Sequence, residues 1–350
     1  FPVSLANIMK RHGYNVTYLD CAREPRMEGV RDKLRRDIPI VSDFTQLERI
    51  IADFGIDVIH SHHAWVDSTI LDILPEEVNC RTVVTLHGMY ETINEYDLRP
   101  ILPRLVKRSA KLIYVADKNL EAIDRHGLLQ YARVSRIDNA LEPESFEPVS
   151  RESLGIDDGA FVLTLVSRGM VEKGWVEAIE SVSVAREASG RDIQLLLVGD
   201  GPEYERLLQE QLPAFVHLQG FQRNVRGYFA ASNLGFLPSK FRGESFPLVI
   251  IECLQTGVPF LASDLGEIAR MLDTAGGMAG EVVPLDGDEV DVPRMTAAIT
   301  RFATDEAYYR AARDRVVSAA AKFDPALLAE RHDLAYREAL AGDEALRAIA

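Results

Sequence analysis

The sequence predicts an α/β protein built from two doubly wound, Rossmann-like domains. Its 350 residues exceed one ordinary hydrophobic core and suit two domains. Short apolar segments alternate with amphipathic helical ones along most of the chain, which is the pattern of βαβ units and parallel sheets. Two prolines interrupt the alternation at residues 141–150. We therefore expect an N-terminal domain at 1–145, a C-terminal domain at 146–324 and a final helical segment at 325–350.

The N-terminal half is expected to open on a helix at residues 4–12, which Gly13 ends. A doubly wound domain normally begins with a strand and a turn, so we expect its first strand to be missing ahead of Phe1. The charged residues 22–37 are interpreted as a loop. Further helices are expected at 44–54, 102–109 and 118–126, and strands at 14–19, 57–60, 81–86, 111–116 and 132–137.

The second half shows the same alternation of strands and helices, with glycines and prolines marking the element ends more clearly. Its strands are expected at 161–166, 194–198, 216–218, 234–237 and 258–262, and its helices at 175–187, 203–211, 225–231, 248–256, 293–304, 307–322 and 325–340. Pro247 marks the start of the helix at 248–256, and Gly257 marks its end. Domains of this kind bind ligands at the carboxyl ends of their strands, so the site is expected in the loops that follow them.

Composition excludes several classes of partner and compartment. The net charge of -15 argues against a nucleic-acid partner, because such proteins need a basic face. Cys21, Cys80 and Cys253 lack metal-ligand spacing and cannot all pair with one another, which fits a reducing compartment. No apolar run approaches the roughly 20 residues of a membrane span, and no stretch resembles a signal peptide. We expect a cytoplasmic protein.

Two carboxylates stand eight positions apart, at Glu244 and Glu252. Glu252 lies in the middle of the expected helix among apolar neighbours, so we expect it to be partly buried. A buried charge needs a partner, and a ligand hydroxyl is one candidate. Glu244 lies in a loop just before the helix, where free backbone N–H groups favour anions. A helix-capping Glu244 and a salt-bridged core Glu252 are the alternative that spacing alone leaves open.

Arg168 and Lys173 lie in the loop that follows the strand at 161–166 and leads into a helix. Two cations at this spacing suit a diphosphate, with the arginine as a fork and the lysine as a point charge. A solvated loop is the alternative. The next strand ends in a turn with glycines at Gly199 and Gly201, where backbone can approach a ligand, although such turns are common. It lacks the GxGxxG pattern, which argues against a nicotinamide dehydrogenase.

Histidines follow two strands of the first half, at His60, His62 and His63 and again at His87, and should face the same cleft. No Asp or Glu lies within the cluster and HExxH spacing is absent, so we expect no metal site. A hydrogen-bonding structural histidine is the alternative. His87 is the better functional candidate, because Gly88 leaves room beside it.

Two further features of the chain leave alternatives open. Phe221 follows Gly220 at a strand end, where it can face a ligand or serve packing. Arg104, Lys107, Arg108 and Lys111 stand among apolar residues, and this basic stretch can touch an anionic membrane surface or form a solvated helix face. No GxSxG elbow supports a hydrolase.

The order and spacing of these motifs resemble the retaining GT-B glycosyltransferases of glycosyltransferase family 4 over nearly the whole chain. The matching segments also include Asp138-Asn139-Ala140 and Pro238-Ser239. The resemblance implies transfer of a hexose-type sugar from a nucleotide diphosphate sugar to a glycan or lipid-linked acceptor, with retention, no cofactor and no metal. Surface polysaccharide synthesis and peripheral contact with the inner face of the membrane would fit this family.

The resemblance also implies roles for individual residues. Arg168 and Lys173 would neutralise the diphosphate, and Glu252 would bind the ribose. The N-terminal domain would bind the acceptor, and the final helix would cross back to pack on it. The donor sugar would contact Glu244, the backbone of Ser245, Phe246 and Leu248, and His87 from the opposite domain; Gly201 and Phe221 complete the expected nucleotide site.

Three departures from the family pattern affect these expectations. The family's first strand and glycine-rich loop are absent from the sequence. Pro247, which has no N–H, stands where the family often has glycine. The loop at 264–268 has one glycine where family members often have two. The alternatives are a non-catalytic nucleotide-sugar-binding or assembly module of a larger protein, or another GT-B enzyme such as an epimerase or phosphorylase.

Overall fold

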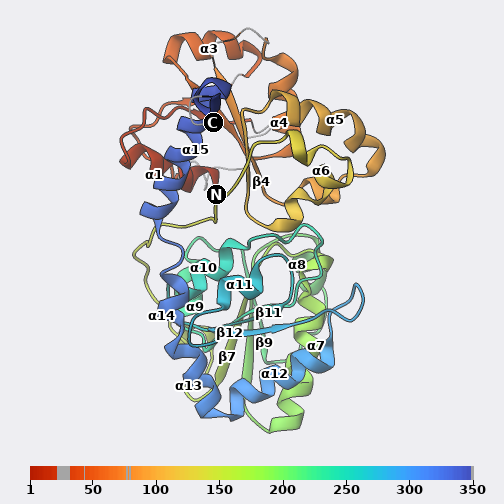
Figure 1. Cartoon of the computed structure of the whole chain (residues 1–350). Coiled ribbons are helices and arrows are strands. Elements are labelled where there is room, and N and C mark those ends of the chain that lie inside the picture. The colour runs from red at the N-terminus through yellow and green to blue at the C-terminus, as the bar shows by residue number, and fades with distance from the viewer. Residues whose placement is uncertain (22–31, 43, 76–77, 79, 348–350) are drawn as a thin grey trace. The chain divides into compact units, whose positions relative to one another are not determined.

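A computed structural model of the chain describes residues 1–21, 32–42, 44–75, 78 and 80–347. The chain divides into two compact units (Figure 1). Unit 1 comprises Phe1–Glu142 and Asp324–Ala350, and unit 2 comprises Pro143–Phe323. Both units contain parallel sheets with helices between the strands, which confirms the predicted α/β class.

Unit 1 holds a four-stranded parallel sheet in the order β3-β4-β5-β6 and a separate parallel pair, β1-β2. The strands are β1 (Tyr18–Leu19), β2 (Ile40–Val41), β3 (Val58–Ser61), β4 (Arg81–Leu86), β5 (Lys111–Tyr114) and β6 (Val134–Arg136). Buried Val84, Leu86 and Leu112 from the sheet meet Leu102 and Ile123 from the helices, and these contacts form the core next to the strand ends.

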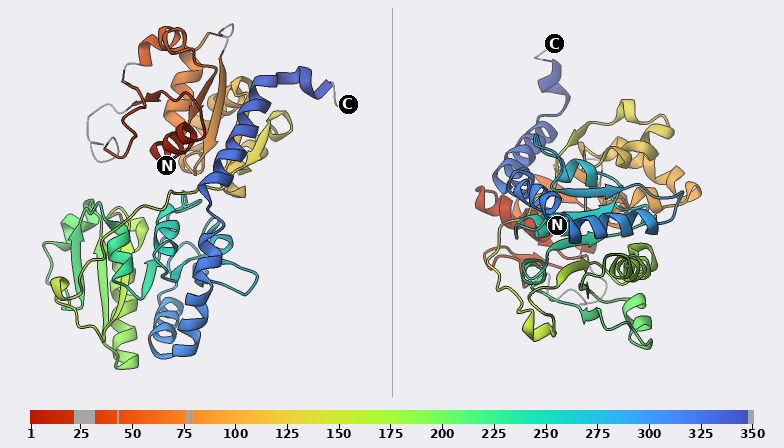
Figure 2. Two further views of the ribbon diagram at one scale, coloured as in Figure 1. Left: turned by 90° about the vertical axis from the view of Figure 1, so that its left-hand side faces the viewer. Right: turned by 90° about the horizontal axis from the view of Figure 1, so that it is seen from below.

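The helices of unit 1 come from both ends of the sequence. They are α1 (Pro2–Arg11), α3 (Leu47–Phe54), α4 (Ala64–Ile73), α5 (Glu95–Arg108), α6 (Glu121–Arg125) and α15 (Pro325–Arg347). Helix α15, blue in Figure 2, packs on α1, β4 and β5. Lys111 Nζ lies 2.6 Å from Glu338 Oε2, and Tyr14 donates a 2.5 Å hydrogen bond to Asp333. The helix is thus an integral part of unit 1.

The structure corrects several expected elements of unit 1. Helix α5 begins at Glu95 rather than at residue 102, although it contains Pro100 and Pro103. Asn94 caps its first turn by accepting from the Asp97 N–H at 3.0 Å, and its apolar face is buried, so capping and burial outweigh the prolines. Only two residues of the expected strand at 14–19 pair, and α4 was not predicted. Residues 22–31 of the expected loop lie outside the described residues.

Unit 2 contains a six-stranded parallel sheet in the order β12-β11-β10-β7-β8-β9. The strands are β7 (Phe161–Val166), β8 (Ile193–Val198), β9 (Val216–Gly220), β10 (Leu234–Leu237), β11 (Phe260–Ser263) and β12 (Gly280–Val283). The chain order therefore reverses between β7 and β10, and doubly wound sheets bind ligands beside such a reversal. The predicted bounds of β7 and β10 are confirmed, whereas β12 was not predicted.

The helices of unit 2 lie on both faces of its sheet (Figure 1). They are α7 (Trp175–Ser189), α8 (Pro202–Leu207), α9 (Val225–Ala230), α10 (Leu248–Leu254), α11 (Ile268–Leu272), α12 (Val292–Thr304), α13 (Glu306–Asp314) and α14 (Val316–Ala320). Helices α7 and α12 pack together, and α10 packs on α9 and α14. The single helix expected at 307–322 is divided into α13 and α14, and α11 was not predicted.

Candidate functional site

Three loops of unit 2 meet at the carboxyl ends of neighbouring strands. They are residues 167–174 after β7, residues 199–201 after β8 and residues 238–247 after β10. The Gly169 N–H donates to the Asp200 carbonyl at 2.6 Å, and the Lys240 N–H donates to the Glu172 carbonyl at 2.8 Å. Main-chain hydrogen bonds thus join the loops at the reversal of strand order.

Glycines allow these loops to approach so closely. A Cβ atom on Gly174 would lie 1.9 Å from the Pro238 carbonyl oxygen, and one on Gly199 would lie 1.9 Å from the Ser167 carbonyl oxygen. Gly201, at the start of α8, has φ of 132°, and a Cβ there would lie 2.7 Å from the Gly169 carbonyl oxygen. Larger residues cannot take these positions without moving backbone. The glycine turn, a weak signal in the sequence, serves loop-to-loop contact.

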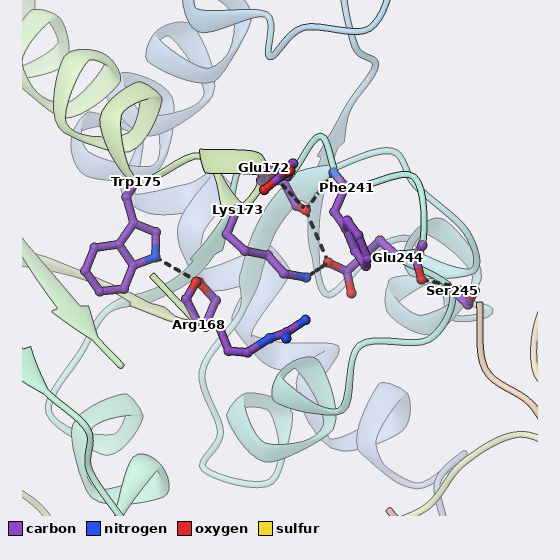
Figure 3. Close-up of polar contacts among 10 residues, drawn as sticks. Arg168, Glu172, Lys173, Trp175, Phe241, Glu244 and Ser245 are labelled. Carbon is purple, nitrogen blue, oxygen red and sulfur yellow. Dashed lines mark hydrogen bonds and ion pairs between the residues drawn. The ribbon is translucent and has the colours of Figure 1, made fainter. Parts of the chain in front are cut away.

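Lys173 and Glu244 form an ion pair at the centre of these loops (Figure 3). Lys173 Nζ lies 2.5 Å from Glu244 Oε2, and the two side chains are only 12% and 10% exposed. Ser239 Oγ also donates to Glu244 at 3.2 Å, and the ammonium lies 4.7 Å from the centre of the Phe241 ring. The predicted diphosphate-binding cation and sugar-binding carboxylate therefore touch each other. An ammonium has three N–H donors, so Lys173 can bind an anion while it remains paired.

Arg168 supplies the second predicted cation. It lies in the same loop and is exposed, and its side chain extends toward the Lys173–Glu244 pair (Figure 3). Its guanidinium makes no hydrogen bond or ion pair with the part of the chain that the structure describes. The site thus combines one cation fixed by a carboxylate with one that remains open to an incoming anion.

The backbone from Ser245 to Leu248 is held in place from two sides. Gly266 lies against Ser245, where a Cβ would meet the Ser245 carbonyl oxygen at 2.4 Å, and the Glu267 N–H donates to that oxygen at 2.9 Å. Phe246 is buried and packs edge-on against Phe323, with ring centres 5.8 Å apart. Its side chain is part of the core, so only its main chain can serve a ligand. Leu248 opens α10 and is half-buried.

Glu252 lies in the middle of α10, with its side chain 19% exposed. The partial burial predicted for it is confirmed. Its Oε1 atom lies 3.8 Å from Nη1 of Arg226, which sequence reasoning did not identify. The carboxylate therefore has a protein partner, and a carboxylate offers about four acceptor sites in all.

Phe221 stands beyond β9 with 64% of its surface exposed. It follows Gly220, whose φ of 61° turns the chain out of the sheet. The structure does not support the packing alternative for this ring, since a packed aromatic would be buried. The ring is available to a planar ligand at the same edge of the sheet as the three loops.

His60, His62 and His87 form one hydrogen-bonded, stacked cluster, whereas the predicted His63 is exposed and contacts Trp65. His62 Nδ1 lies 3.2 Å from His87 Nε2, and the His60 and His62 rings lie 4.1 Å apart. His60 also hydrogen-bonds to Tyr336 and Thr85, each at 2.7 Å. Burial lowers the pKa of His87 to about 3, so its imidazole is neutral at pH 7. Among the described residues, no group of His, Cys, Asp and Glu is arranged to hold a metal ion.

A buried carboxylate missed by sequence reasoning connects the two histidine loops. Asp67, on α4, accepts hydrogen bonds from Ser61 at the end of β3 and from Tyr90 at 2.9 Å. Burial raises the pKa of this aspartate to about 6. A lone Asp in an unpredicted helix gave no signal in the sequence, because its partners lie on other elements.

The basic stretch of α5 is largely occupied within unit 1. Arg104 pairs with Asp72, Arg108 donates to carbonyl groups at the end of α4, and Lys111 pairs with Glu338. Only Lys107 of the four is exposed. Arg108 and Lys111 therefore serve tertiary contacts, whereas for Arg104 and Lys107, which lie at the surface, a membrane-facing patch and a solvated helix face both stay predictions. Within the described ranges, none of the helices is long and apolar enough to cross a membrane.

Comparison with known families agrees with this geometry. Residues 3–145 match the model of "Glycosyltransferase Family 4", and residues 160–305 match that of "Glycosyl transferases group 1". The two models together match most of the chain, so its similarity to glycosyltransferase family 4 extends over both units. The resemblance stated from the motifs is confirmed.

The curated relatives of the chain are named for different substrates. It is 28% identical to the alpha-D-kanosaminyltransferase of Streptomyces kanamyceticus over 67% of this chain and 61% of the relative. It is 24% identical to the UDP-Gal:alpha-D-GlcNAc-diphosphoundecaprenol alpha-1,3-galactosyltransferase of Escherichia coli over 66% of this chain and 65% of that one. The matched region thus spans less than two thirds of these relatives.

Solved structures of GT-B glycosyltransferases share the fold. The sucrose-phosphate synthase of Thermosynechococcus elongatus superposes with a TM-score of 0.71 and 21% identity, covering 96% of this chain and 92% of that one. HepE of Anabaena in complex with UDP superposes with a TM-score of 0.72 and 16% identity, covering 95% and 94%. At these identities the likeness establishes the GT-B fold.

Proposed function

We propose that the protein transfers a hexose-type sugar from a nucleotide diphosphate sugar to a glycan or lipid-linked acceptor, with retention and without a metal. The observation that carries the proposal is the Lys173–Glu244 pair beside the open cation Arg168, at the reversal of strand order. Two cations on loops that glycines allow to approach closely suit the diphosphate of such a donor.

The cations act where charge develops during transfer. As the bond between the sugar and the diphosphate breaks, negative charge accumulates on the leaving phosphate oxygens, and donors already in place stabilise it without rearrangement. Glu244 holds the Lys173 ammonium in position before the donor arrives. Arg168, which is exposed, closes on the diphosphate with a planar fork. Glu244 and the backbone from Ser245 to Leu248 also contact the donor sugar.

The nucleoside half of the donor is assigned to the neighbouring elements of unit 2. Glu252 accepts hydrogen bonds from the ribose, the Phe221 ring covers the base, and Gly201 lets backbone approach the phosphates. UDP is the first nucleotide to test, because the HepE structure contains UDP and the Escherichia coli relative is named for a UDP-sugar donor.

Unit 1 is assigned the acceptor, and His87 is the residue proposed to act on the transferred sugar. The imidazole is neutral at pH 7, since burial holds its pKa near 3, so it acts as a hydrogen-bonding group rather than as a cation. A lipid-linked acceptor in surface polysaccharide synthesis is supported by the relative named for a diphosphoundecaprenol substrate. We place the protein in the cytoplasm, at the inner face of the membrane when the acceptor is lipid-linked.

The proposal is tested first by nucleotide binding. A panel of UDP, GDP, ADP, dTDP and CMP is compared by thermal shift with the full-length protein. A ligand at 100 times its Kd contributes about 2.7 kcal/mol of stability, which is readily measured. Stabilisation by one nucleotide supports the donor site, and no stabilisation by any of them contradicts it.

Sugar transfer then separates catalysis from binding. Labelled nucleotide sugar is incubated with the wild-type protein and with Lys173→Ala and His87→Ala, in the presence and absence of membrane extract. We expect transfer or donor hydrolysis by the wild type, strong loss in both variants, and unchanged nucleotide affinity in His87→Ala. Binding without transfer or hydrolysis would instead identify a non-catalytic nucleotide-sugar-binding module.

A further inference from the structure

Arg226 is a buried cation that the proposed function does not yet use. It lies in the first turn of α9, just beyond β9, and only 5% of its surface is exposed. A guanidinium cannot be buried at moderate cost unless acceptors and a counter-charge surround it. The position of those partners indicates what Arg226 does.

Two of the partners of Arg226 lie on one face of α10. Its Nε and Nη2 atoms donate to Gln255 Oε1 at 3.1 and 2.8 Å. Its Nη1 atom lies 3.8 Å from Glu252 Oε1, as an ion pair, and donates a 3.3 Å hydrogen bond to Glu144 Oε2. Glu252 and Gln255 are three residues apart and so face the same side of the helix. The two bonds to one amide oxygen fix the plane of the guanidinium and thereby the direction of Nη1.

The two carboxylates near Nη1 differ in their surroundings. The Glu144 side chain is 53% exposed, so water screens its interaction with the guanidinium. The Glu252 side chain is only 19% exposed, so it feels the charge of Arg226 more strongly. The attraction between the two charges therefore holds the Glu252 carboxylate on the side of α10 that faces Arg226.

We infer that Arg226 is a positioning residue for the donor nucleoside: through its ion pair it holds the Glu252 carboxylate where that carboxylate accepts both ribose hydroxyls. The inference rests on the proposed ribose role of Glu252. It adds that the site selects ribonucleotides, because a sugar without these hydroxyls leaves the oriented carboxylate without its donors. The partly buried Glu252 carboxylate would then lack hydrogen-bond donors from the ligand, which weakens nucleotide binding.

The experiment compares two ligands, UDP and 2′,3′-dideoxyuridine 5′-diphosphate, by titration calorimetry. Arg226→Gln should weaken UDP binding about tenfold, the scale of one charge-assisted hydrogen bond, and change binding of the dideoxy ligand less than about twofold. Glu252→Gln should show the same pattern, and the double variant should lose no more than either single one. Glu144→Gln, which removes the screened carboxylate, is the matched control and should bind UDP like the wild type.

Arg226→Lys keeps a charge but not the fork, so it should lose part of the UDP affinity and none of the dideoxy affinity. This variant keeps the inference testable if Arg226→Gln does not fold, which thermal unfolding without ligand would reveal. Equal weakening of both ligands in Arg226→Lys or Arg226→Gln would overturn the inference, because Arg226 would then act through the fold of unit 2.

Two outcomes distinguish failure of this inference from failure of the proposed function. If Glu252→Gln weakens UDP while both Arg226 variants bind it normally, Glu252 binds the ribose without Arg226, and the inference is wrong. If Glu252→Gln binds UDP normally, the ribose role itself is wrong, and the inference falls with it.

Discussion

The two units place opposite kinds of chemistry on the same kind of scaffold. In both, loops at the carboxyl ends of parallel strands gather polar side chains, but unit 2 gathers charges and unit 1 gathers neutral imidazoles. Lys173 and Glu244 form an ion pair in unit 2, whereas burial holds the pKa of His87 near 3 in unit 1. The difference teaches that the sheet supplies only the location, and that the loops make the site charged in one unit and neutral in the other.

The units also differ in what holds their loops. In unit 2 the loops touch through backbone, at Gly174 and Gly199, where a Cβ would clash with a carbonyl oxygen. In unit 1 the two histidine loops are joined by side chains, through Asp67 and its hydroxyl donors Ser61 and Tyr90. The donor site should therefore respond most to backbone changes and the histidine loops most to pH.

The largest effect is expected from Gly174→Ala, with Gly190→Ala as the matched control. The two glycines flank α7 with φ of 74° and 63°, but only Gly174 faces a carbonyl oxygen, while Gly190 faces open space. The control should cost roughly 1–2 kcal/mol of strain. Gly174→Ala should destabilise unit 2 by more than about 4 kcal/mol.

Tryptophan fluorescence measures this difference for each unit separately. The chain has two tryptophans, and Trp175 is fully buried in unit 2 while Trp65 lies in unit 1. In a Trp65→Phe background, denaturant unfolding of Trp175 reports on unit 2 alone. Equal losses in the two glycine variants would show that backbone contact does not fix the donor loops.

A smaller effect is expected from Lys173→Ala, in which transfer should fall by about 10²–10³-fold because a transition-state contact is lost. Stability should also fall, by about 3 kcal/mol, since Glu244 remains buried without its cation. Adding Glu244→Gln should restore stability but not transfer, as measured by denaturant unfolding and labelled-sugar assay. Recovery of both would show that Lys173 is only structural.

Acid should affect unit 1 before unit 2. Burial lowers the pKa of His87 to about 3 and that of His332 to about 4, and it also lowers those of His60 and His62, so the folded state binds fewer protons than the unfolded state below pH 6.5. Stability is therefore complete above about pH 6.5 and is lost as pH falls toward 4. The raised pKa of Asp67, about 6, has the opposite effect and stabilises the folded state as pH falls. Its contribution is that of one group, whereas the four histidines act together.

The expected loss in unit 1 between pH 7 and pH 4.5 is on the order of several kcal/mol. Trp65 fluorescence, measured in a Trp175→Phe background during denaturant unfolding at each pH, would report it. Trp175 in the converse background should show a smaller change. If unit 2 lost stability at a higher pH than unit 1, the prediction that unit 1 is the more acid-sensitive unit would be wrong.

The smallest effect is expected from Phe221→Ala. Because the ring is 64% exposed, stability should change by less than about 0.5 kcal/mol. UDP affinity should fall about 5–10-fold if the ring stacks on the base. Val184→Ala, an exposed apolar residue on α7, is the control and should leave affinity unchanged. Unchanged affinity in both variants would remove Phe221 from the site.

The sequence predicted those parts of the fold and site that depend on residues close together in the chain, such as the glycines and prolines that end helices and strands. The alternation of strands and helices, the bounds of β7 and β10 and the placement of Arg168 and Lys173 on one loop follow from residues close in the chain. The contact between Lys173 and Glu244, and that between Arg226 and Glu252, join separate loops and helices, so spacing cannot reveal them. Helix α5 was predicted too short because its two prolines argue against a helix. Burial of its apolar face offsets them, and burial is a tertiary effect that local sequence does not show.

The return of α15 to unit 1 affects synthesis of the chain on the ribosome. Tyr336, which hydrogen-bonds to His60, and Glu338, which pairs with Lys111, are translated only after all of Pro143–Phe323. At about 5–20 residues per second, that interval lasts on the order of 10–40 seconds. During this time the His60, His62 and His87 cluster lacks its contacts with α15. Unit 2 is continuous in sequence and can fold as soon as it emerges. During synthesis, unit 1 is therefore exposed to misfolding for longer than unit 2.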